Sequence, residues 1–491
     1  MRILLVTFYD VRCTGLRILA SCLKKHNHDV NICLIKEHCS KNVNYFSEQH
    51  MAYQIIDSSG YLVSMCDANP ITDVEEQILF KHIRNINPDV IGFSLRSYLN
   101  DITIDLIKKI KKLFPQLPII CGGFGPTLEP ELFVPHVDAV VRGEGEEAIV
   151  EVCEALENGE TLKNIANVSC FSDGKIIQNS LRSPCIKISC YPWAFTFHDG
   201  DNRFTLIENF TLTHGDPLKT WQAYCFLLGR GCLGSCSYCS GGQWNKMYYE
   251  AGYKIPKRRM RDIQDAIEEL SRAKQDGYKR IHFTDEYFAA SISYINDFLD
   301  QYEKKINLPV EMYLHYNFII NHPEILHRLA NLGLRNVCLG VQSGDEKFAR
   351  EIYNRHTTHE DMIKFAHMVK KEGISLTVHL IVGNPLESEK IFQNSLKFLS
   401  LLPFEKGVDT LTCFRFTPFP HSPIVKEFGA KVTSPMPQKA FERQGCLAQL
   451  RVLLHDKEFF PLLYNKKYFD HPDLLQKKYY GIMGIMDNKC C

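Results

Sequence analysis

The chain has 491 residues, of which 45% are hydrophobic and 23% are charged, and its formal net charge at pH 7 is +0. This composition is typical of a globular protein of about two to four domains with a sizeable core. The balanced charge does not favour nucleic acid or an acidic membrane as a main partner. Since no apolar run reaches about 18 residues, we predict no transmembrane helix.

The beginning of the chain and its cysteines indicate the compartment. The first eleven residues, MRILLVTFYDV, hold a short apolar run that predicts a first strand rather than a signal peptide. The 19 cysteines are an odd number scattered along the chain, which argues against a disulfide framework. We therefore predict a protein of the reducing cytoplasm.

Residues 1–157 alternate between strand and helix patterns. Their hydrophobic runs are continuous rather than alternating, as expected of strands that are covered on both faces. We predict a Rossmann-like (flavodoxin-like) doubly wound parallel sheet. The predicted strands are residues 2–7, 30–35, 89–94, 117–121 and 137–141, and the predicted helices are residues 15–25, 73–86, 102–113 and 144–157.

Residues 158–221 form a less regular connector, with a hairpin predicted over 171–177 around Asp173-Gly174. A second strand–helix series follows over 222–424 and predicts a partial (β/α)6 barrel of the TIM type. Residues 425–491 predict a helical C-terminal extension that packs on the barrel or covers its mouth. The barrel strands are predicted at residues 224–228, 280–284, 310–316, 336–341, 375–382 and 410–416, separated by helices at 263–275, 292–303, 324–332, 360–372 and 388–401.

Three cysteines with a CxxxCxxC spacing follow the first predicted barrel strand. They are Cys232, Cys236 and Cys239, in the stretch GRGCLGSCSYCSGG. Thiolates are soft ligands for iron–sulfur clusters and zinc, but structural zinc takes four protein ligands and no second cysteine pair with suitable spacing is present. A [4Fe–4S] cluster held by three cysteines leaves one iron open to another molecule. We predict that these three cysteines are metal ligands.

Cys232-x3-Cys236-Ser237-Tyr238-Cys239 resembles the signature of the radical S-adenosylmethionine (SAM) superfamily. The resemblance covers most of residues 222–424. It implies that the open iron chelates SAM, which is cleaved reductively to a 5′-deoxyadenosyl radical. Further segments at the expected strand ends resemble the family's SAM-binding segments, although Gln342 stands where glutamate is usual and the family's GGE segment is absent. The SAM contacts implied by the resemblance are Tyr238, Asp285, Gln342, Ser343, Gly383 and Pro418.

Glycine turns end two strands of the N-terminal sheet, within residues 122–131 and 142–146, and Ser94 ends a third strand. Ligands of open α/β sheets bind at such strand ends. The order of these segments resembles the cobalamin-binding domain found before many radical SAM barrels. The cobalamin contacts implied by the resemblance are Ser94, Leu95, Gly122, Gly123, Thr127, Gly143 and Glu144.

One departure concerns the loop that follows the first strand. The DxHxxG motif, whose histidine ligates cobalt in many cobalamin proteins, is missing, and residues 9–15 read YDVRCTG instead. We therefore predict that cobalt takes no histidine ligand from this loop. The alternative is a retained fold with an empty or repurposed pocket.

These resemblances together imply a cobalamin-dependent radical SAM enzyme that methylates an unactivated carbon of a small-molecule or peptide substrate. An electron donor such as flavodoxin or ferredoxin is expected, and nucleic acid is not. The first alternative is a radical rearrangement, cyclisation or oxidation without methyl transfer, and the second is a non-enzymatic metal-binding or RNA-associated protein. A methylthiotransferase is disfavoured, because Cys13, Cys22 and Cys33 are too evenly spaced to form that family's N-terminal cluster set.

Overall fold

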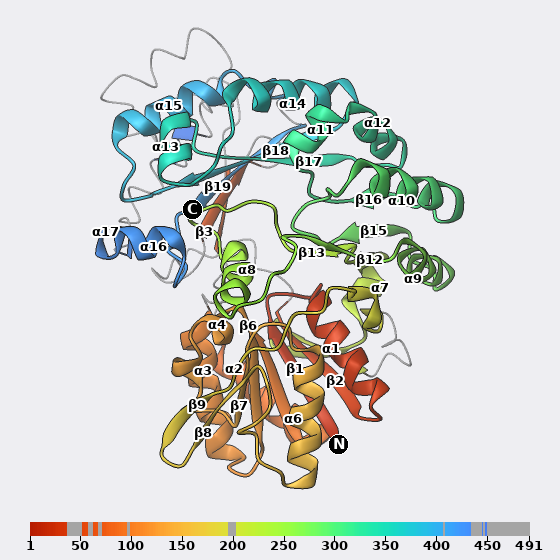
Figure 1. Cartoon of the computed structure of the whole chain (residues 1–491), viewed down its shortest axis with the longest axis vertical. Helices are drawn as coiled ribbons and strands as arrows, with labels where there is room; N and C mark the ends of the chain where they lie inside the picture. The colour runs from red at the N-terminus through yellow and green to blue at the C-terminus, as the bar shows by residue number, and fades with distance from the viewer. Residues whose placement is uncertain are drawn as a thin grey trace.

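The computed structural model describes residues 1–36, 52–56, 62–66, 71–95, 99–194, 203–405, 408–433, 444 and 447–448. The protein consists of two stacked parts (Figure 1). A sheet flanked by helices forms the N-terminal part, and the strands of the open barrel form the second. Helix α8 (Gly241–Glu250) lies between them.

The N-terminal part is built on a nine-stranded sheet in the order β11-β10-β2-β1-β5-β6-β7-β8-β9. The six strands from β10 to β7 run parallel, and an antiparallel strand or hairpin extends the sheet at each edge. The strands are β1 (Arg2–Phe8), β2 (Asp29–Ile35), β5 (Val90–Leu95), β6 (Ile119–Gly123), β7 (Ala139–Val141), β8 (Val168–Ser172), β9 (Lys175–Gln178), β10 (Phe204–Glu208) and β11 (Thr211–His214).

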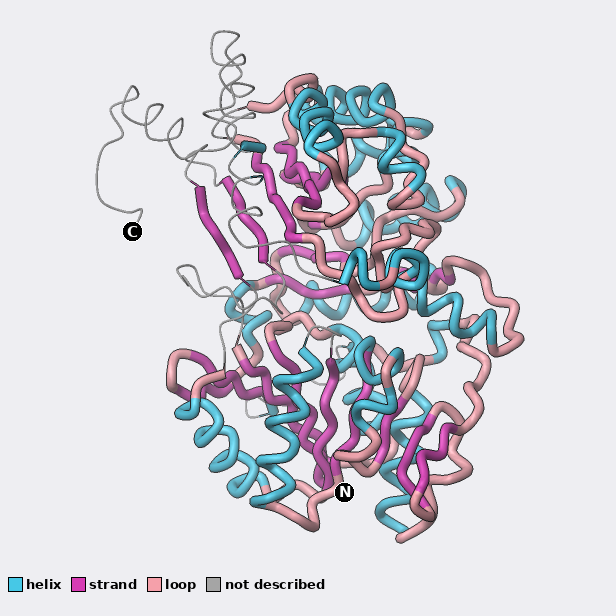
Figure 2. The backbone as a smooth tube through the Cα atoms, turned by 90° about the vertical axis from the view of Figure 1, so that its left-hand side faces the viewer, coloured by secondary structure: helices cyan, strands magenta, loops and turns pink. Residues whose placement is uncertain are grey.

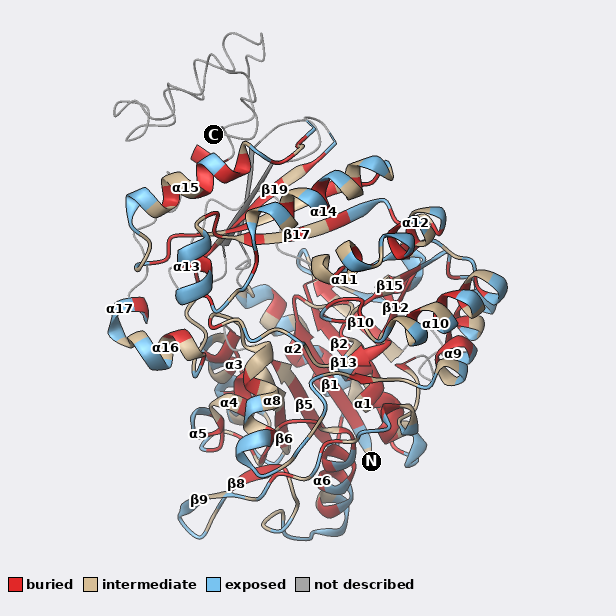
Figure 3. Cartoon of the chain, turned by 45° about the horizontal axis from the view of Figure 1, so that its top comes forward, coloured by how far each residue is buried: buried red, intermediate tan, exposed pale blue. Residues whose placement is uncertain are grey.

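Helices cover both faces of this sheet, because alternate strand residues point to opposite sides. Ile3 and Leu5 of β1 pack in one core with α1 and α6, whereas Leu4 and Val6 pack in the other with α2 and α3. Figure 3 shows the strands buried and the helices exposed on their outer sides. The predicted doubly wound fold is confirmed. The helices are α1 (Thr14–Lys25), α2 (Asp73–Ile86), α3 (Asn100–Leu113), α4 (Phe124–Leu128), α5 (Pro130–Phe133) and α6 (Glu146–Asn158).

The connector over 158–221 contributes two hairpins to this sheet, of which the sequence predicted only the first. The expected hairpin is present as β8 and β9, with Asp173 and Gly174 at φ 52° and 74°, values that suit a tight two-residue turn. A second hairpin, β10 and β11, pairs with β2 at the opposite edge. The connector therefore covers both edges of the sheet before the chain enters the barrel.

The second part holds six parallel-type strands in chain order, in two sheets: β12-β15-β16, and β17-β18-β19 extended by β3-β4. The predicted partial barrel is thereby confirmed, with one strand much shorter than expected. Residues 310–316 were predicted as a strand, but β16 ends at Glu311 and α11 begins at Tyr316. The strands are β12 (Ala223–Phe226), β15 (Arg280–Phe283), β16 (Val310–Glu311), β17 (Asn336–Gln342), β18 (Ser375–Val382) and β19 (Thr410–Arg415), with a hairpin of β13 (Gly229–Arg230) and β14 (Arg259–Met260).

Helices alternate with these strands and are tied to them by the main hydrophobic core. Besides α8 they are α7 (Pro217–Trp221), α9 (Ile263–Gln275), α10 (Ile292–Lys305), α11 (Tyr316–Asn321), α12 (Pro323–Asn331), α13 (Glu346–Glu351), α14 (His359–Lys371), α15 (Glu389–Leu399), α16 (Pro423–Phe428) and α17 (Ala430–Thr433). None of the helices in the described ranges is long and apolar enough to cross a membrane.

A hairpin from early in the chain completes the barrel sheet. Strands β3 (Ala52–Ile56) and β4 (Leu62–Cys66) follow β2 in sequence, yet β3 pairs antiparallel with β19. Figure 2 shows the barrel strands above the N-terminal sheet. The predicted boundary at residue 157 therefore does not separate the two parts completely, because residues 52–56 and 62–66 belong to the barrel sheet.

Most of the predicted helical C-terminal extension, 425–491, lies outside the described residues. At the start of this segment, helix α17 follows α16. Further along, Leu447 and Ala448 are buried in the barrel core. Gln444 is also buried, and its side-chain oxygen accepts a hydrogen bond from Gly383 N at 2.7 Å. The described part of this segment therefore packs on the barrel.

Buried ion pairs join the two parts. Arg17 of α1 makes a bidentate pair with Asp216 before α7, with N–O distances of 2.5 and 2.7 Å. Arg12, from the loop after β1, lies 3.0 Å from His282 Nε2 of β15. His282 Nδ1 lies 3.1 Å from Glu311. Arg12, which stands where the DxHxxG motif has its histidine, therefore contacts strand β15 of the barrel.

Candidate functional site

A cavity of about 300 Å³ lies between the carboxyl ends of the N-terminal strands and the start of the barrel. Ligand sites usually begin at about this size. Its wall combines the turns after β5, β6 and β7 with the loop after β12. The predicted residues that line it are Ser94, Gly122, Gly123, Gly143, Glu144 and Cys232.

The glycine turns hold this cavity open. Gly123 has φ 98°, and a Cβ there would lie 2.4 Å from the carbonyl oxygen of Leu95. Leu95 therefore supports the turn from below and is not among the lining residues. Thr127 also lies outside the lining, and its hydroxyl accepts a hydrogen bond from Gly143 N at 3.1 Å. Leu95 and Thr127, both predicted cobalamin contacts, therefore contact the backbone of the turns.

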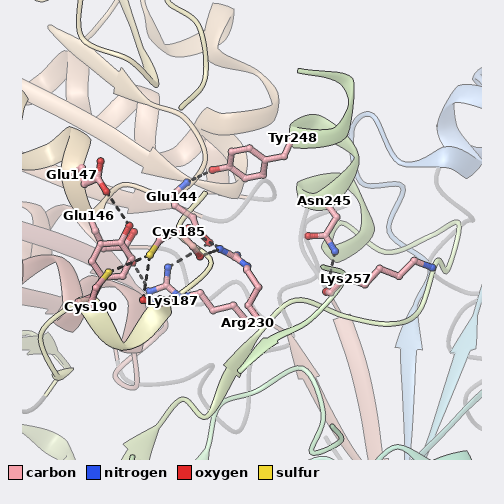
Figure 4. A network of polar contacts seen from close by, with 12 residues as sticks. Glu144, Glu146, Glu147, Cys185, Lys187, Cys190, Arg230, Asn245, Tyr248 and Lys257 are labelled. Carbon is pink, nitrogen blue, oxygen red and sulfur yellow. Dashed lines mark hydrogen bonds and ion pairs between the residues drawn. The ribbon is translucent and has the colours of Figure 1, made fainter. Parts of the chain in front are cut away.

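Glu144 lines the cavity and also pairs with cationic side chains of the protein. Its carboxylate is buried and binds both guanidinium nitrogens of Arg259, one of them at 3.1 Å, and Arg230 lies 3.5 Å away. Arg230 also pairs with Glu146 at 2.5 Å. These arginines belong to the β13–β14 hairpin, so the two glutamates bind protein cations of the barrel (Figure 4).

Tyr248 of α8 completes this junction. Its hydroxyl oxygen accepts a hydrogen bond from Glu144 N at 2.7 Å, and a Cβ on Gly143 would lie 2.2 Å from the same oxygen. Figure 4 shows the tyrosine reaching from its helix to Glu144. Gly143 is therefore required for contact between the two parts, in addition to its place in the cavity wall.

The three predicted metal ligands lie on the loop between β13 and α8. Cys232, Cys236 and Cys239 are each half-buried. Backbone N–H groups of Gly234 and Gly241 donate to the sulfurs of Cys232 and Cys239, both at 3.3 Å. Such hydrogen bonds are characteristic of thiolates that bind metal centres.

Burial raises the pKa of Cys232, and it raises that of Cys239 to about 11, so metal binding would have to displace protons. In the described ranges no three His, Cys, Asp or Glu side chains are close enough to hold a single metal ion. Cysteine thiolates are the usual ligands of iron–sulfur clusters, so this donor set fits a cluster.

Asp285, a predicted SAM contact, is already occupied. It is buried at the end of β15 and accepts hydrogen bonds from Leu228 N at 2.8 Å, Gly229 N at 2.7 Å and Arg258 at 2.6 Å. Burial raises its pKa, and the adjacent Arg258 opposes this change. Asp285 therefore fixes the start of the cysteine loop. The next residue, Glu286, is exposed in the cavity wall and is the carboxylate available to a cationic group.

Tyr238 lies against the barrel rather than in the cavity. Its ring packs edge-on against Tyr353 at 4.9 Å, and its hydroxyl accepts a hydrogen bond from Arg355 at 3.2 Å. Arg355 also donates to Gly340 O at 2.5 Å and lies 3.9 Å from the sulfur of Cys236. Sequence reasoning missed this arginine, which lies 15 residues after Gly340 in the chain.

The other predicted SAM residues end neighbouring barrel strands. Gln342 ends β17 at a register shift and has φ 64°, and Ser343 beside it is buried. Gly383 has φ 81° and donates to Gln444, while Pro418 is half-buried after β19. In the described part of the chain none of these residues lines the cavity. They form a second region, on the barrel side of the cysteine loop.

Comparison with known proteins identifies the two parts of the chain. The family model described as Radical SAM superfamily matches residues 226–399, and the B12 binding domain matches residues 3–153. The chain is a radical SAM enzyme with an N-terminal B12 binding domain. Both sequence resemblances are confirmed, and with them the predicted cofactor set of a [4Fe–4S] cluster, SAM and cobalamin.

Relatives of this radical SAM enzyme carry several activities. It is 23% identical over 449 residues to the anaerobic magnesium-protoporphyrin IX monomethyl ester cyclase of Rubrivivax gelatinosus, covering 84% of this chain and 73% of the relative. It is 24% identical over 376 residues to an uncharacterized methyltransferase of Pyrococcus horikoshii, covering 73% and 75%.

Among solved structures, the enzyme is similar to the radical SAM methyltransferase TsrM of Kitasatospora setae, at a TM-score of 0.61 and 16% identity. The similarity covers 87% of this chain and 76% of TsrM. At this identity the comparison establishes a shared fold.

Proposed function

We propose that this radical SAM enzyme methylates an unactivated carbon of a small-molecule or peptide substrate. The observation that supports the proposal is the single cavity whose wall contains both the glycine turns of the B12 binding domain and Cys232 of the cysteine loop. Two cofactors that meet at one cavity can act on one substrate. The methyltransferase relatives, TsrM among them, agree with this direction.

We assign Cys232, Cys236 and Cys239 to the cluster, and the turns at Gly122, Gly123 and Gly143 to cobalamin. When bound, the cluster and SAM supply a 5′-deoxyadenosyl radical, and cobalamin supplies the methyl group. The chain contributes orientation: the arginines held by Glu144 and Glu146 fix the cysteine loop against the turns. We exclude Asp285 as a SAM contact, because its carboxylate already accepts three hydrogen bonds from the protein. We add Arg355 and Glu286. The remaining proposed SAM contacts are Tyr238, Gln342, Ser343, Gly383 and Pro418.

The finer setting is also a proposal. A flavodoxin or ferredoxin would donate the electron that cleaves SAM, and the enzyme would work in the cytoplasm.

The test uses anaerobically reconstituted enzyme with SAM that carries a deuterated methyl group, and candidate small molecules or peptides. We expect hydroxocobalamin binding, release of 5′-deoxyadenosine and a product that carries the labelled methyl group. The C232A variant should lose the iron–sulfur absorbance and 5′-deoxyadenosine formation. Failure of the parent enzyme to bind hydroxocobalamin would refute methylation through cobalamin.

The second candidate function is a radical cyclisation, oxidation or rearrangement, favoured by the similarity to the Rubrivivax gelatinosus cyclase over 84% of the chain. The same experiment separates the two candidates. A substrate that is consumed with release of 5′-deoxyadenosine, but without gain of the labelled methyl group, would favour this second function.

A further inference from the structure

A pair of thiols lies in the connector, apart from the three cysteines assigned to the cluster. Cys185 and Cys190 are separated by four residues, and their sulfurs are 3.2 Å apart. Cys190 closes the single turn η2 (Ile188–Cys190) and its backbone N–H donates to Lys187 O at 2.9 Å. The turn therefore brings the two side chains together.

Both thiols of this pair are accessible. Cys185 is half-buried and Cys190 is exposed, whereas Cys33 and Cys121 are fully buried in the N-terminal sheet. A disulfide requires an S–S distance of about 2.05 Å, so the two sulfurs need to approach by only about 1 Å. Because the two sulfurs are already in contact, no other side chain has to move for the bond to form.

We propose that Cys185 and Cys190 form a reversible disulfide by exchange with an external disulfide. The thiolate of one cysteine attacks one sulfur of the external disulfide, and the displaced sulfur leaves as a thiolate that takes up a proton. The other cysteine, after deprotonation, then attacks the Sγ of the first and releases the second external sulfur as a thiolate that takes up a proton. In total, two protein S–H bonds and one external S–S bond become one protein S–S bond and two external S–H bonds.

Either cysteine can make the first attack, because Cys185 is half-buried and Cys190 is exposed. The Cys185 thiol also donates to Lys187 O at 3.3 Å, so neither sulfur is singled out as the first to react. The second step is favoured, because the sulfur that is attacked already lies 3.2 Å from the attacking sulfur.

The pair lies against the cavity wall described above. The backbone oxygen of Cys185 accepts a hydrogen bond from Arg259 at 2.6 Å, and the ring of Tyr191 lies 5.4 Å from the guanidinium carbon of Arg230. Figure 4 shows both cysteines beside Arg230 and the glutamates that bind it. A disulfide would fix the segment between these contacts, so oxidation of the pair would change the dynamics of the β13–β14 hairpin.

The test treats the cluster-loaded enzyme with oxidised glutathione under anaerobic conditions, followed by alkylation and peptide mapping. We expect the parent enzyme to show a peptide linked through Cys185 and Cys190 that has lost two hydrogens, and reduced dithiothreitol to reverse it. The C190S variant should accumulate glutathione on Cys185 and the C185S variant should accumulate it on Cys190, because each variant lacks the second step. The lone half-buried Cys338 serves as the control, through C338S, which should still form the linked peptide.

Absence of the linked peptide in the parent enzyme, or a glutathione adduct that persists in the parent as it does in the two variants, would overturn the proposal. Hydrogen exchange of residues 258–262 provides the second measurement, with an expected change of about threefold between the oxidised and reduced enzyme. Unchanged exchange would refute the connection to the cavity wall. Because Arg259 binds a backbone oxygen, C185S itself leaves that contact in place.

Discussion

The buried pair of Glu144 and Arg259 gives the sharpest test of how the two parts are joined. Both side chains are at most 7% exposed, and the carboxylate binds two nitrogens of the guanidinium. The substitution E144Q keeps the shape of the side chain but leaves the Arg259 charge without its carboxylate. Arg230 is affected less, because it keeps its pair with Glu146.

The magnitude follows from this geometry. Removing one partner of a buried ion pair costs about 3 to 5 kcal/mol, because a charge remains buried and unpaired. Arg259 retains the bond to Cys185 O, so we expect E144Q to lower the free energy of unfolding by about 3 kcal/mol. R259M alone should cost a similar amount, whereas the double variant should cost about as much as one single variant.

The assay is a double-mutant cycle on urea unfolding of the apoenzyme, followed by tryptophan fluorescence and circular dichroism. The expected coupling between Glu144 and Arg259 is about 3 kcal/mol. The exposed pair of Lys163 and Asp173 serves as the control, where K163M should cost about 1 kcal/mol or less.

Additive effects of E144Q and R259M would refute this reasoning. So would an E144Q variant that unfolds like the parent enzyme and differs only in hydroxocobalamin binding. That second result would return Glu144 to the ligand-contact role that the sequence predicted.

Three further predictions concern the turns and the barrel. G123A should destabilise the enzyme by about 2 kcal/mol and abolish hydroxocobalamin binding, because its Cβ would clash with Leu95 O. The effects of G122A on stability and on binding should be smaller, because its Cβ would lie 3.4 Å from Val141 O. Thermal unfolding and binding titrations measure both variants. R355Q should lower the reduction potential of the reconstituted cluster by roughly 50 mV, since it removes a positive charge 3.9 Å from the Cys236 sulfur, and R355K should restore most of it in a redox titration followed by EPR. Burial raises the pKa of Glu387 to about 8 from 4.5. Below pH 4.5 the carboxyl is protonated in both the folded and the unfolded state, so it does not lower the free energy of unfolding. As the pH rises through 8 the buried carboxyl ionises, and its full cost to stability is present above that pH. E387Q should therefore match the parent in thermal stability at pH 4.5 and exceed it by about 2 kcal/mol above pH 8; equal stability at both pH values would contradict the assignment.

Strand and helix patterns were enough to predict both parts of the fold. Predicted helix 263–275 coincides with α9, and predicted strand 375–382 coincides with β18. These elements bury a continuous apolar face, so local periodicity determines them. Residues 310–316 were predicted too long, because a turn of helix begins at Tyr316 and interrupts the same apolar run.

Pairing between distant segments could not be predicted in the same way. The short strands β3 and β4 follow β2 in the chain but complete the barrel sheet beside β19. Strand periodicity indicates which face of a strand is apolar, but it does not indicate which sheet edge the strand joins. The same limit applies to β10 and β11, which the sequence assigned only to a connector.

The candidate site shows why motif residues and ligand contacts are different sets. The turn that contains Gly143 and Glu144 was predicted to face cobalamin, and Gly143 does line the cavity. Yet the same turn accepts Tyr248 from α8, the helix that follows the cysteine loop, at a point where any side chain on Gly143 would collide with the tyrosine hydroxyl. A glycine in this motif is thus required twice, once by the open cavity and once by the docking of the helix. Because one turn serves both purposes, a substitution there would shift the cysteine loop relative to the cobalamin side of the cavity, and its effect on activity would exceed the loss of a single ligand contact.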